Sequence, residues 1–133
     1  MTKTGFVLTV TLISCLTAGC ESVQVERYGS VIGVKEEKLE QYKDLHANPW
    51  PEVNAMLKEC NIQNYSIYLR RMPDGNHYLF SYFEYTGDDF EADMAWLEEH
   101  PRNIEWLKVC DPMQIPLEGF ESWAEMEQIY FND

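Results

Sequence analysis

The fold is decided by the stretch Ile62-Gln-Asn-Tyr-Ser-Ile-Tyr-Leu-Arg-Arg-Met72, which is followed by Pro73-Asp-Gly-Asn76 and then by His77-Tyr-Leu-Phe-Ser-Tyr-Phe-Glu-Tyr-Thr86. The first and third segments are rich in aromatic residues and alternate in hydrophobicity, which is typical of β-strands. The segment between them has the composition of a tight turn. We therefore expect two antiparallel strands, 62–72 and 77–86, joined as a hairpin.

On the amino-terminal side, the hairpin is preceded by one expected strand and two expected helices. Strand-forming residues gather at 27–35, and apolar residues recur at helical spacing over 35–46. Pro49 disfavours helical geometry at the residue before it, so this first helix should end there. Pro51 suits the first turn of a second helix, which we expect at 52–60.

On the carboxy-terminal side, a third helix is expected to begin at 87–89, to break at Pro101 and to end near Cys110. We expect a loop over 111–119, and a helical turn followed by a last strand within 123–131. The order β-α-β-β-α-β is that of the ferredoxin-like sandwich. This is an α+β fold, in which helices cover one face of a four-stranded antiparallel sheet.

Both faces of the expected middle strands carry large side chains. In the second strand of the hairpin, Phe80 and Tyr82 alternate with Leu79 and Phe83. Helices cover only one face of such a sheet, so the other face should pack against a partner. The simplest partner is a second copy of the chain, and we therefore expect a homodimer in the form of a dimeric α/β barrel.

The N-terminus has the pattern of a secretion signal. Lys3 is followed by an apolar run that is shorter than the roughly 20 residues needed to span a membrane. The sequence Leu16-Thr-Ala-Gly-Cys20 resembles a lipobox, whose cysteine thiol receives a diacylglycerol and becomes the new N-terminus. An ordinary cleaved signal, an uncleaved anchor and lipidation at Cys15 are the alternatives.

This pattern predicts the organisation and the location of the protein. Residues 1–19 form a lipoprotein-type signal peptide, residues 20–26 a short tether and residues 27–133 the folded domain. We expect the protein to be exported and attached to a bacterial membrane, facing the periplasm or the outer membrane. The lipid anchor is then its only contact with the membrane.

The charge balance excludes one class of partner. The 133 residues include 10 Lys and Arg against 23 Asp and Glu, which gives a net charge of −13. Such a chain repels phosphate backbones and anionic lipid head groups, so we expect no nucleic-acid partner. The aromatic content of 14% is nevertheless too high for a disordered acidic segment.

The expected domain contains two cysteines, Cys60 and Cys110, each at the end of an expected helix. In a β-α-β-β-α-β fold we expect the two helical segments to lie side by side and to run the same way, which brings these ends together and makes a disulfide possible. Two buried free thiols are the alternative, which we favour slightly. No cysteine or histidine spacing matches a metal site, so we expect no metal.

The strongest candidate for chemistry is His46, which shares a helix face with Tyr42, four residues earlier. A histidine titrates near neutral pH and can both donate and accept a proton. Aromatic side chains that could line a sugar site are Trp50, Trp106, Tyr65 and Tyr68. Glu52 and Glu84 are candidates for orienting the histidine. Each of these residues also has an ordinary structural explanation.

Several motifs together resemble those of the L-rhamnose mutarotase family. They are Tyr42-Lys-Asp-Leu-His46-Ala-Asn-Pro-Trp50-Pro-Glu52, Asn64-Tyr-Ser-Ile-Tyr-Leu69, Leu79-Phe-Ser-Tyr-Phe-Glu84, Glu105-Trp-Leu-Lys108 and Glu125-Met-Glu-Gln-Ile-Tyr130. The resemblance covers about 27–131 and implies a dimer of ferredoxin-like subunits. It also implies an isomerase that interconverts the α and β anomers of a 6-deoxy sugar without metal or organic cofactor.

The resemblance further implies roles for individual residues. The proton donor of the family falls on His46, and its sugar-contacting tyrosines fall on Tyr42 and Tyr65. Its tryptophan pair falls on Trp106 and Leu107. The leucine departs from the family pattern and puts the identity of the sugar in doubt. The signal peptide is a second departure, because the usual setting of the family is the cytoplasm.

The reaction requires one proton at the ring oxygen and the removal of another from the anomeric hydroxyl. His46 can supply the acid, while water, a tyrosine or a carboxylate takes the second proton. We therefore expect a mutarotase for L-rhamnose or a related deoxy sugar. The alternatives are a lipid-anchored sugar-binding protein and another cofactor-free enzyme of the dimeric α/β barrel type, such as a monooxygenase.

The lipobox pattern predicts that Cys20 carries lipid. When the full chain is produced in a bacterium fed labelled fatty acid, the label should enter the wild type and Cys15→Ser but not Cys20→Ser. A full-length, unlabelled protein in the cytosolic fraction would contradict this prediction.

Overall fold

We describe a computed structural model of the chain, and the structure describes residues 24–132. The predicted signal peptide, the lipidation site at Cys20 and most of the predicted tether therefore lie outside the described residues. The strands are β1 (Glu26–Val34), β2 (Ile62–Arg71), β3 (His77–Tyr85), β4 (Gln114–Ile115) and β5 (Ala124–Met126). The helices are η1 (Glu36–Lys38), α1 (Leu39–Ala47), α2 (Pro51–Glu59), α3 (Phe90–Glu99), α4 (Pro101–Cys110) and η2 (Asp111–Met113).

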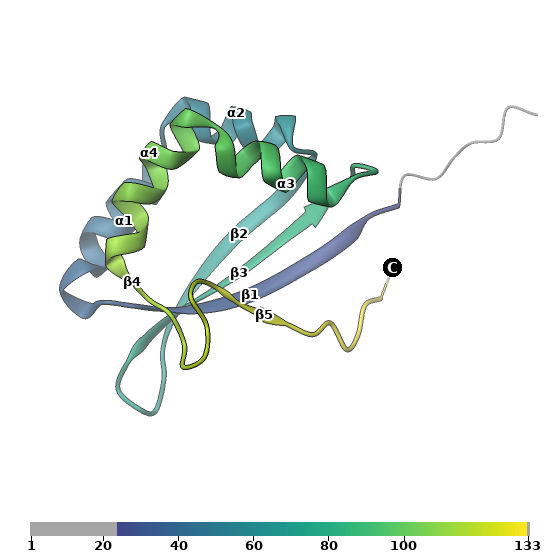
Figure 1. Cartoon of the computed structure of the whole chain (residues 1–133). Coiled ribbons are helices and arrows are strands. Elements are labelled where there is room, and N and C mark those ends of the chain that lie inside the picture. Colours follow the sequence, from purple (N-terminus) through teal and green to yellow (C-terminus); the bar gives the residue numbers. More distant parts are fainter. Residues whose placement is uncertain (1–23, 133) are drawn as a thin grey trace, which may run out of the picture.

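The strands form one antiparallel sheet in the order β2-β3-β1-β4, with β5 also paired to β1. All the α-helices lie on the same face of this sheet (Figure 1). The ladder between β1 and β3 is continuous, and the hydroxyls of the opposed Ser30 and Ser81 are 2.6 Å apart. The predicted α+β, ferredoxin-like fold is confirmed, and so is the predicted hairpin of β2 and β3.

The edge of the sheet differs from the prediction in its details. The fourth strand position beside β1 is shared by two short strands, of which β4 lies within the segment 111–119 that we expected to be a loop. β5 is the expected last strand, but it begins without a helical turn. Because both strands are only a few residues long, they lack the alternation that identifies the longer strands from sequence.

Each of the two helical segments, α1 with α2 and α3 with α4, is interrupted at a proline. Asn48, the residue before Pro49, has φ −131° and ψ 62°, and α2 begins at Pro51. The second break is at Pro101, where His100 Nδ1 accepts a hydrogen bond from the Arg102 amide at 3.2 Å. Two short helices in place of one long helix make the layer arch over the sheet (Figure 1). Over residues 24–132, no helix combines the length and the apolar character needed to cross a membrane.

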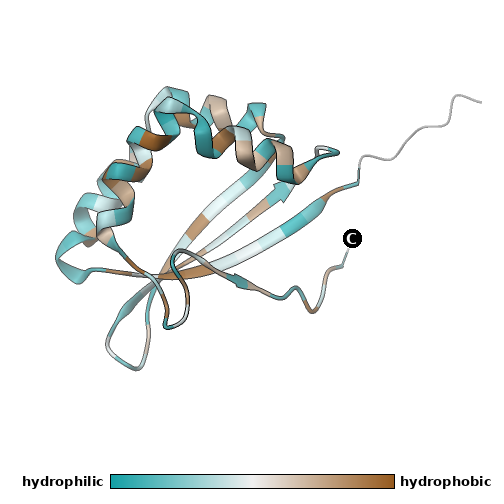
Figure 2. Cartoon of the chain, viewed as in Figure 1, coloured by the Kyte–Doolittle hydropathy of each residue, from teal (hydrophilic) through white to brown (hydrophobic). Residues whose placement is uncertain are grey.

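The hydrophobic core consists of two clusters. One joins the sheet to α1 and η2 through Ile32, Val34, Tyr42, Leu79 and Met113. The other lies within the helical layer and contains Val53, Met56, Trp106 and Cys110. Apolar residues accordingly alternate with polar ones along the helices, and the end of β1 nearest α1 is strongly hydrophobic (Figure 2). The cavity described below lies between the sheet and the arch of the helices.

Cys60 and Cys110 are both buried free thiols, so the possible disulfide between them is not formed. Our assumption about helix direction was wrong. Each helical segment runs opposite to the strand before it, and β1 is antiparallel to β3, so the two segments are antiparallel to one another. Cys60 therefore lies beside α3, where its Sγ donates to the Asp93 carbonyl at 3.4 Å. Cys110 lies at the opposite end of the layer, next to η2.

Candidate active site

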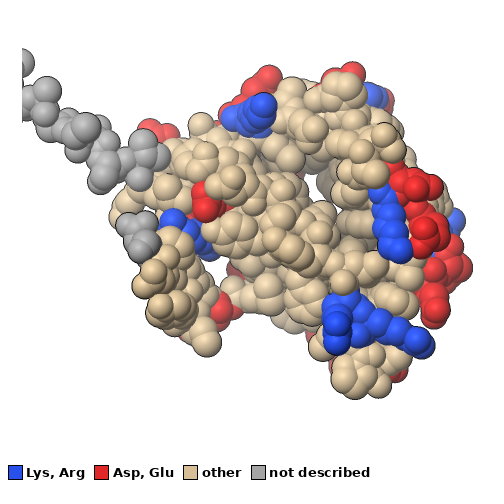
Figure 3. All heavy atoms as spheres, turned by 180° about the vertical axis from the view of Figure 1, so that it is seen from behind, with Lys and Arg blue, Asp and Glu red and all other residues tan. Residues whose placement is uncertain are grey.

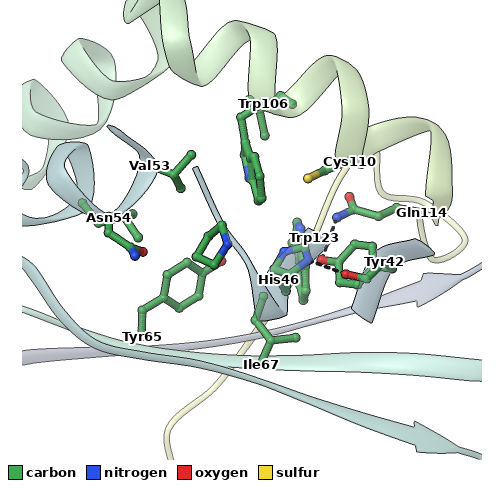
Figure 4. A pocket seen from close by; sticks show the side chains of 13 residues that line it. Tyr42, His46, Val53, Asn54, Tyr65, Ile67, Trp106, Cys110, Gln114 and Trp123 are labelled. Carbon is green, nitrogen blue, oxygen red and sulfur yellow. Dashed lines mark hydrogen bonds between the residues drawn. The ribbon is translucent and has the colours of Figure 1, made fainter. Parts of the chain in front are cut away.

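A cavity of about 370 Å³ opens between the arched helices and the sheet. It contains all five site residues predicted from the sequence: Tyr42, His46, Tyr65, Trp106 and Leu107. The other lining residues are Pro49, Val53, Asn54, Leu57, Ile67, Cys110, Gln114 and Trp123. Figure 4 shows the labelled side chains converging on this space from α1, α2, α4 and β2. We call it the His46 cavity.

His46 is held by its own helix. Its Nδ1 lies 2.8 Å from the carbonyl oxygen of Tyr42, one turn earlier. A carbonyl can only accept, so Nδ1 carries the hydrogen and Nε2 is the proton acceptor of the neutral ring. The imidazole stacks on the Tyr42 ring with a centroid separation of 4.1 Å and meets the Trp106 ring edge-on at 5.4 Å. Burial lowers the pKa of His46 from 6.5, although the bond to the carbonyl acts in the opposite direction. The imidazole is therefore neutral at pH 7.

The two tyrosines of the cavity are neutral phenols. Tyr42 is 5% exposed, and its hydroxyl accepts a hydrogen bond from Gln114 Nε2 at 3.4 Å. Burial raises the pKa of Tyr42 above its ordinary value. Although the Tyr65 side chain is 44% exposed, its hydroxyl points into the cavity (Figure 4), and burial raises its pKa as well. Near neutral pH both hydroxyls keep their protons.

A bulge in β2 directs Tyr65 towards the helices. The pairing with β3 is irregular between Gln63 and Ser66, and Asn64 has a φ of 51°. Asn64 holds this left-handed conformation while its Nδ2 donates to Glu84 Oε2 at 2.7 Å. An inserted residue changes which side chains face each side of the sheet. Glu84 thus stabilises the bulge. It does not orient His46, which is the role that the sequence suggested for it.

Trp106 is supported from behind by the start of α2. The Trp50 ring meets it edge-on at 5.2 Å, and the Arg102 guanidinium lies 4.5 Å from the Trp50 centroid. Arg102 also pairs with Glu52 at 3.5 Å, so this carboxylate does not orient the histidine either. Trp50 is thus a support for the cavity wall and not part of the lining.

Tyr68 is the one candidate aromatic residue that lies far from the cavity. It is 65% exposed, and strand alternation places it on the sheet face away from the helices. Leu107 lies at the cavity with 38% of its surface exposed, so it forms part of the rim. The leucine leaves open an edge that a larger side chain would close.

The sequence did not mark Gln114, Trp123 or Asn54 as site residues, although all three line the cavity. Gln114 fell in an expected loop, and Asn54 lies on an exposed helix face without any motif. Cys110 is also part of the lining, but burial raises the pKa of its thiol to about 12, so it stays protonated. Among residues 24–132, no three histidine, cysteine or acidic side chains are grouped as metal ligands would be.

Comparison with known proteins identifies a family that the sequence resembles. The sequence profile of L-rhamnose mutarotase matches residues 27–131. The chain is 32% identical over 89 residues to L-rhamnose mutarotase of Oceanobacillus iheyensis, covering 67% of this chain and 80% of that one. It is 28% identical over 110 residues to L-rhamnose mutarotase of Bacillus subtilis, covering 82% and 100%.

A solved structure has a similar fold. The crystal structure of L-rhamnose mutarotase from Formosa agariphila superposes on this chain with a TM-score of 0.63 and 18% sequence identity. The match covers 81% of this chain and 99% of that one. At this level of identity the similarity is one of fold.

Proposed function

The chain belongs to the L-rhamnose mutarotase family, and from this premise we propose that it interconverts the α and β anomers of L-rhamnose or a related deoxy sugar in the His46 cavity. It is an isomerase that acts on carbohydrates. His46, two neutral tyrosines and an indole converge on a single cavity, and this observation supports the choice of site. The cavity volume of about 370 Å³ suits one monosaccharide.

The proposed mechanism uses His46 as the proton carrier. Ring opening removes the proton of the anomeric hydroxyl and adds one to the ring oxygen. Because Nδ1 is bound to the Tyr42 carbonyl, Nε2 is the atom that exchanges a proton with the sugar. Closure is the reverse of opening, so a histidine that accepts a proton in one half-reaction donates it in the other. His46 is thus the base of ring opening, and it acts in ring closure as the proton donor that the family resemblance implies.

The second proton passes through a hydroxyl or a water. No residue that lines the His46 cavity is a carboxylate. A carboxylate is therefore excluded as the acceptor of the second proton. Tyr42 and Tyr65 have raised pKa values and are therefore donors, not bases, near neutral pH. A tyrosine hydroxyl or a water that it holds can protonate the ring oxygen while His46 takes the other proton.

The apolar part of the cavity accounts for recognition of a deoxy sugar. The Trp106 ring meets the imidazole of His46 edge-on, and Val53 and Ile67 line the same cavity. Aromatic and aliphatic surfaces pack well against the C–H groups and the methyl group of such a sugar. The polar atoms that remain can then bind its hydroxyls.

We also propose a homodimer, in which two sheets pack through the faces that the helices leave open. On this face Tyr68 stands opposite Phe80, and Phe80 stands opposite Val31. The exposed side chains Ile129 and Tyr130, which are 90% and 78% exposed, extend the apolar surface at the C-terminus. Figure 3, a view from behind, shows the charged side chains mostly towards the margins of that side of the molecule. The apolar side chains of the open sheet face can pack together despite the negative net charge of the chain.

The N-terminal pattern supports a further proposal on location. We propose that the signal peptide directs export and that Cys20 carries the lipid anchor that holds the enzyme at a bacterial membrane, facing the periplasm or the outer membrane. The proposal rests on the residues between Lys3 and Cys20. The enzyme would then act on sugar before its uptake.

The rate of interconversion between sugar anomers tests whether His46 carries the proton. NMR exchange spectroscopy with the full chain in detergent should show accelerated interconversion for L-rhamnose within a panel of sugars. His46→Asn keeps a similar size but cannot titrate near pH 7, so it should stay folded and lose about 10²–10⁴-fold in rate. Exchange at near wild-type speed by a folded His46→Asn protein would assign the proton transfer to another group.

The pH dependence of the same reaction follows from the lowered pKa of His46. Neutral imidazole is the reactive acceptor, so the catalysed rate should be full at pH 7 and fall only below pH 6.5. The tyrosines and the Cys110 thiol of the cavity have raised pKa values and do not titrate in this range. A catalysed rate that rises as the pH falls through this range would show that the imidazolium is the reactive form.

Leu107→Trp should tighten the binding of L-rhamnose. An indole at the rim adds stacking area beside the sugar and leaves His46 in place. We expect KM to fall by a few-fold while the maximal exchange rate changes little. If the affinity for every sugar in the panel is unchanged, position 107 does not contact the sugar.

Tyr68→Asp should convert the dimer to a monomer. The substitution places a charge in the middle of the open sheet face, where it would be buried between subunits. Light scattering after size-exclusion chromatography gives the mass in solution. Trp96→Asp is the matched control, because Trp96 is 42% exposed on the helical side. A monomeric wild type, or a dimeric Tyr68→Asp, would overturn the proposed interface.

A further inference from the structure

We propose that Gln114 determines which sugar hydroxyl the His46 cavity recognises, by binding that hydroxyl together with Tyr42. This inference rests on the proposed function and extends it to a residue of β4 that no motif marks. Gln114 is half-buried, lines the cavity and is bonded to Tyr42, whose ring stacks on the imidazole of His46.

The backbone around Gln114 is firmly held, so its side chain starts from a fixed point. Met113 is only 2% exposed and belongs to the core between the sheet and α1. The Lys35 amide donates to the Met113 carbonyl at 2.9 Å, and Lys35 Nζ donates to the Pro112 carbonyl at 2.7 Å. Gln114 itself is paired with Val34 in the sheet. A residue that recognises a ligand needs such support, because little conformational entropy is then lost when the ligand binds.

The direction of the hydrogen bond decides what Tyr42 can do. Gln114 Nε2 donates to the Tyr42 hydroxyl at 3.4 Å, as the dashed line in Figure 4 shows. A hydroxyl that accepts from an amide keeps its own hydrogen for another acceptor. Burial keeps this hydroxyl protonated by raising its pKa, so Tyr42 is available as a donor throughout the neutral range.

The amide oxygen of Gln114 completes the arrangement. A sugar hydroxyl can accept the hydrogen of Tyr42 Oη and donate its own hydrogen to Gln114 Oε1. The phenol, the sugar hydroxyl and the amide then form one closed set of hydrogen bonds, in which each group both gives and receives. A site of this kind rejects a sugar that lacks the hydroxyl, because the buried polar groups are left unpaired.

The test compares Gln114→Met and Gln114→Glu with the wild-type full chain. Methionine has a similar length but cannot bind a hydroxyl, so KM for L-rhamnose should rise roughly tenfold while the maximal exchange rate stays within about threefold. Glutamate accepts the hydrogen of Tyr42 and removes that donor, so KM should rise at least as much. Gln41→Met, a substitution on the exposed side of α1, should leave both constants unchanged.

Binding of monodeoxy analogues of L-rhamnose provides a readout that a structural role would not move. Quenching of tryptophan fluorescence measures affinity without turnover, since Trp106 and Trp123 line the cavity. One analogue should bind the wild type roughly tenfold more weakly than L-rhamnose, and Gln114→Met should bind that analogue and L-rhamnose equally.

The outcomes separate this inference from the proposed function. In one outcome, the wild type accelerates exchange, but both Gln114 variants keep the wild-type KM and bind the analogues with the wild-type preference. Gln114 then does not bind a sugar hydroxyl, and the inference is overturned. The same conclusion follows if the variants lose affinity for all analogues in equal proportion, because Gln114 then supports only the cavity wall. A wild type that accelerates no exchange but still binds L-rhamnose overturns the proposed function, while the analogue series continues to test Gln114. Matching thermal unfolding midpoints establish that the variants are folded.

Discussion

Proline residues keep the helical layer of this domain from lying flat on its sheet, and the cavity depends on that constraint. Pro49 forces the residue before it out of helical geometry, and Pro101 starts a new helix directly after His100. A continuous helix in either place would bury an unbroken apolar face against the strands. The two breaks divide the apolar residues into separate clusters, one against the sheet and one between the helices. The space between these clusters holds the site.

The orientation of His46, the proposed proton carrier, depends on helical structure more than on loops. Tyr42 and His46 are one helical turn apart, so the helix places the carbonyl that binds Nδ1 and also the ring on which the imidazole stacks. Trp106 reaches the same imidazole from α4, with Trp50 and Arg102 behind it. The orientation of the histidine is therefore determined before a sugar arrives, which is what efficient proton transfer requires.

The parts of this structure that depend on local patterns could be predicted from the sequence. Alternation along β2 and β3, the turn between them and the prolines led to the order of the elements, and the family resemblance pointed to the residues around His46. Gln114 could not be predicted, because two residues of strand beside β1 have no alternation and their pairing is a tertiary effect. The roles of Glu52 and Glu84 depended on side-chain partners, Arg102 and Asn64, that only the fold brings close. Helix direction was misjudged although the predicted ferredoxin-like order already implied it, because in that order β1 and β3 are antiparallel and each helical segment runs opposite to the strand before it.

The separation of Cys60 and Cys110 has a consequence for the redox chemistry of the domain. Thiol–disulfide exchange proceeds through the thiolate, and the attacking sulfur needs an open path to its target. Burial raises the pKa of both thiols, that of Cys110 to about 12, and the two residues are only 1% and 3% exposed. Neither sulfur is then an effective nucleophile towards glutathione or an oxidoreductase. The folded domain should behave alike in reducing and oxidising surroundings, and its maturation needs no oxidant.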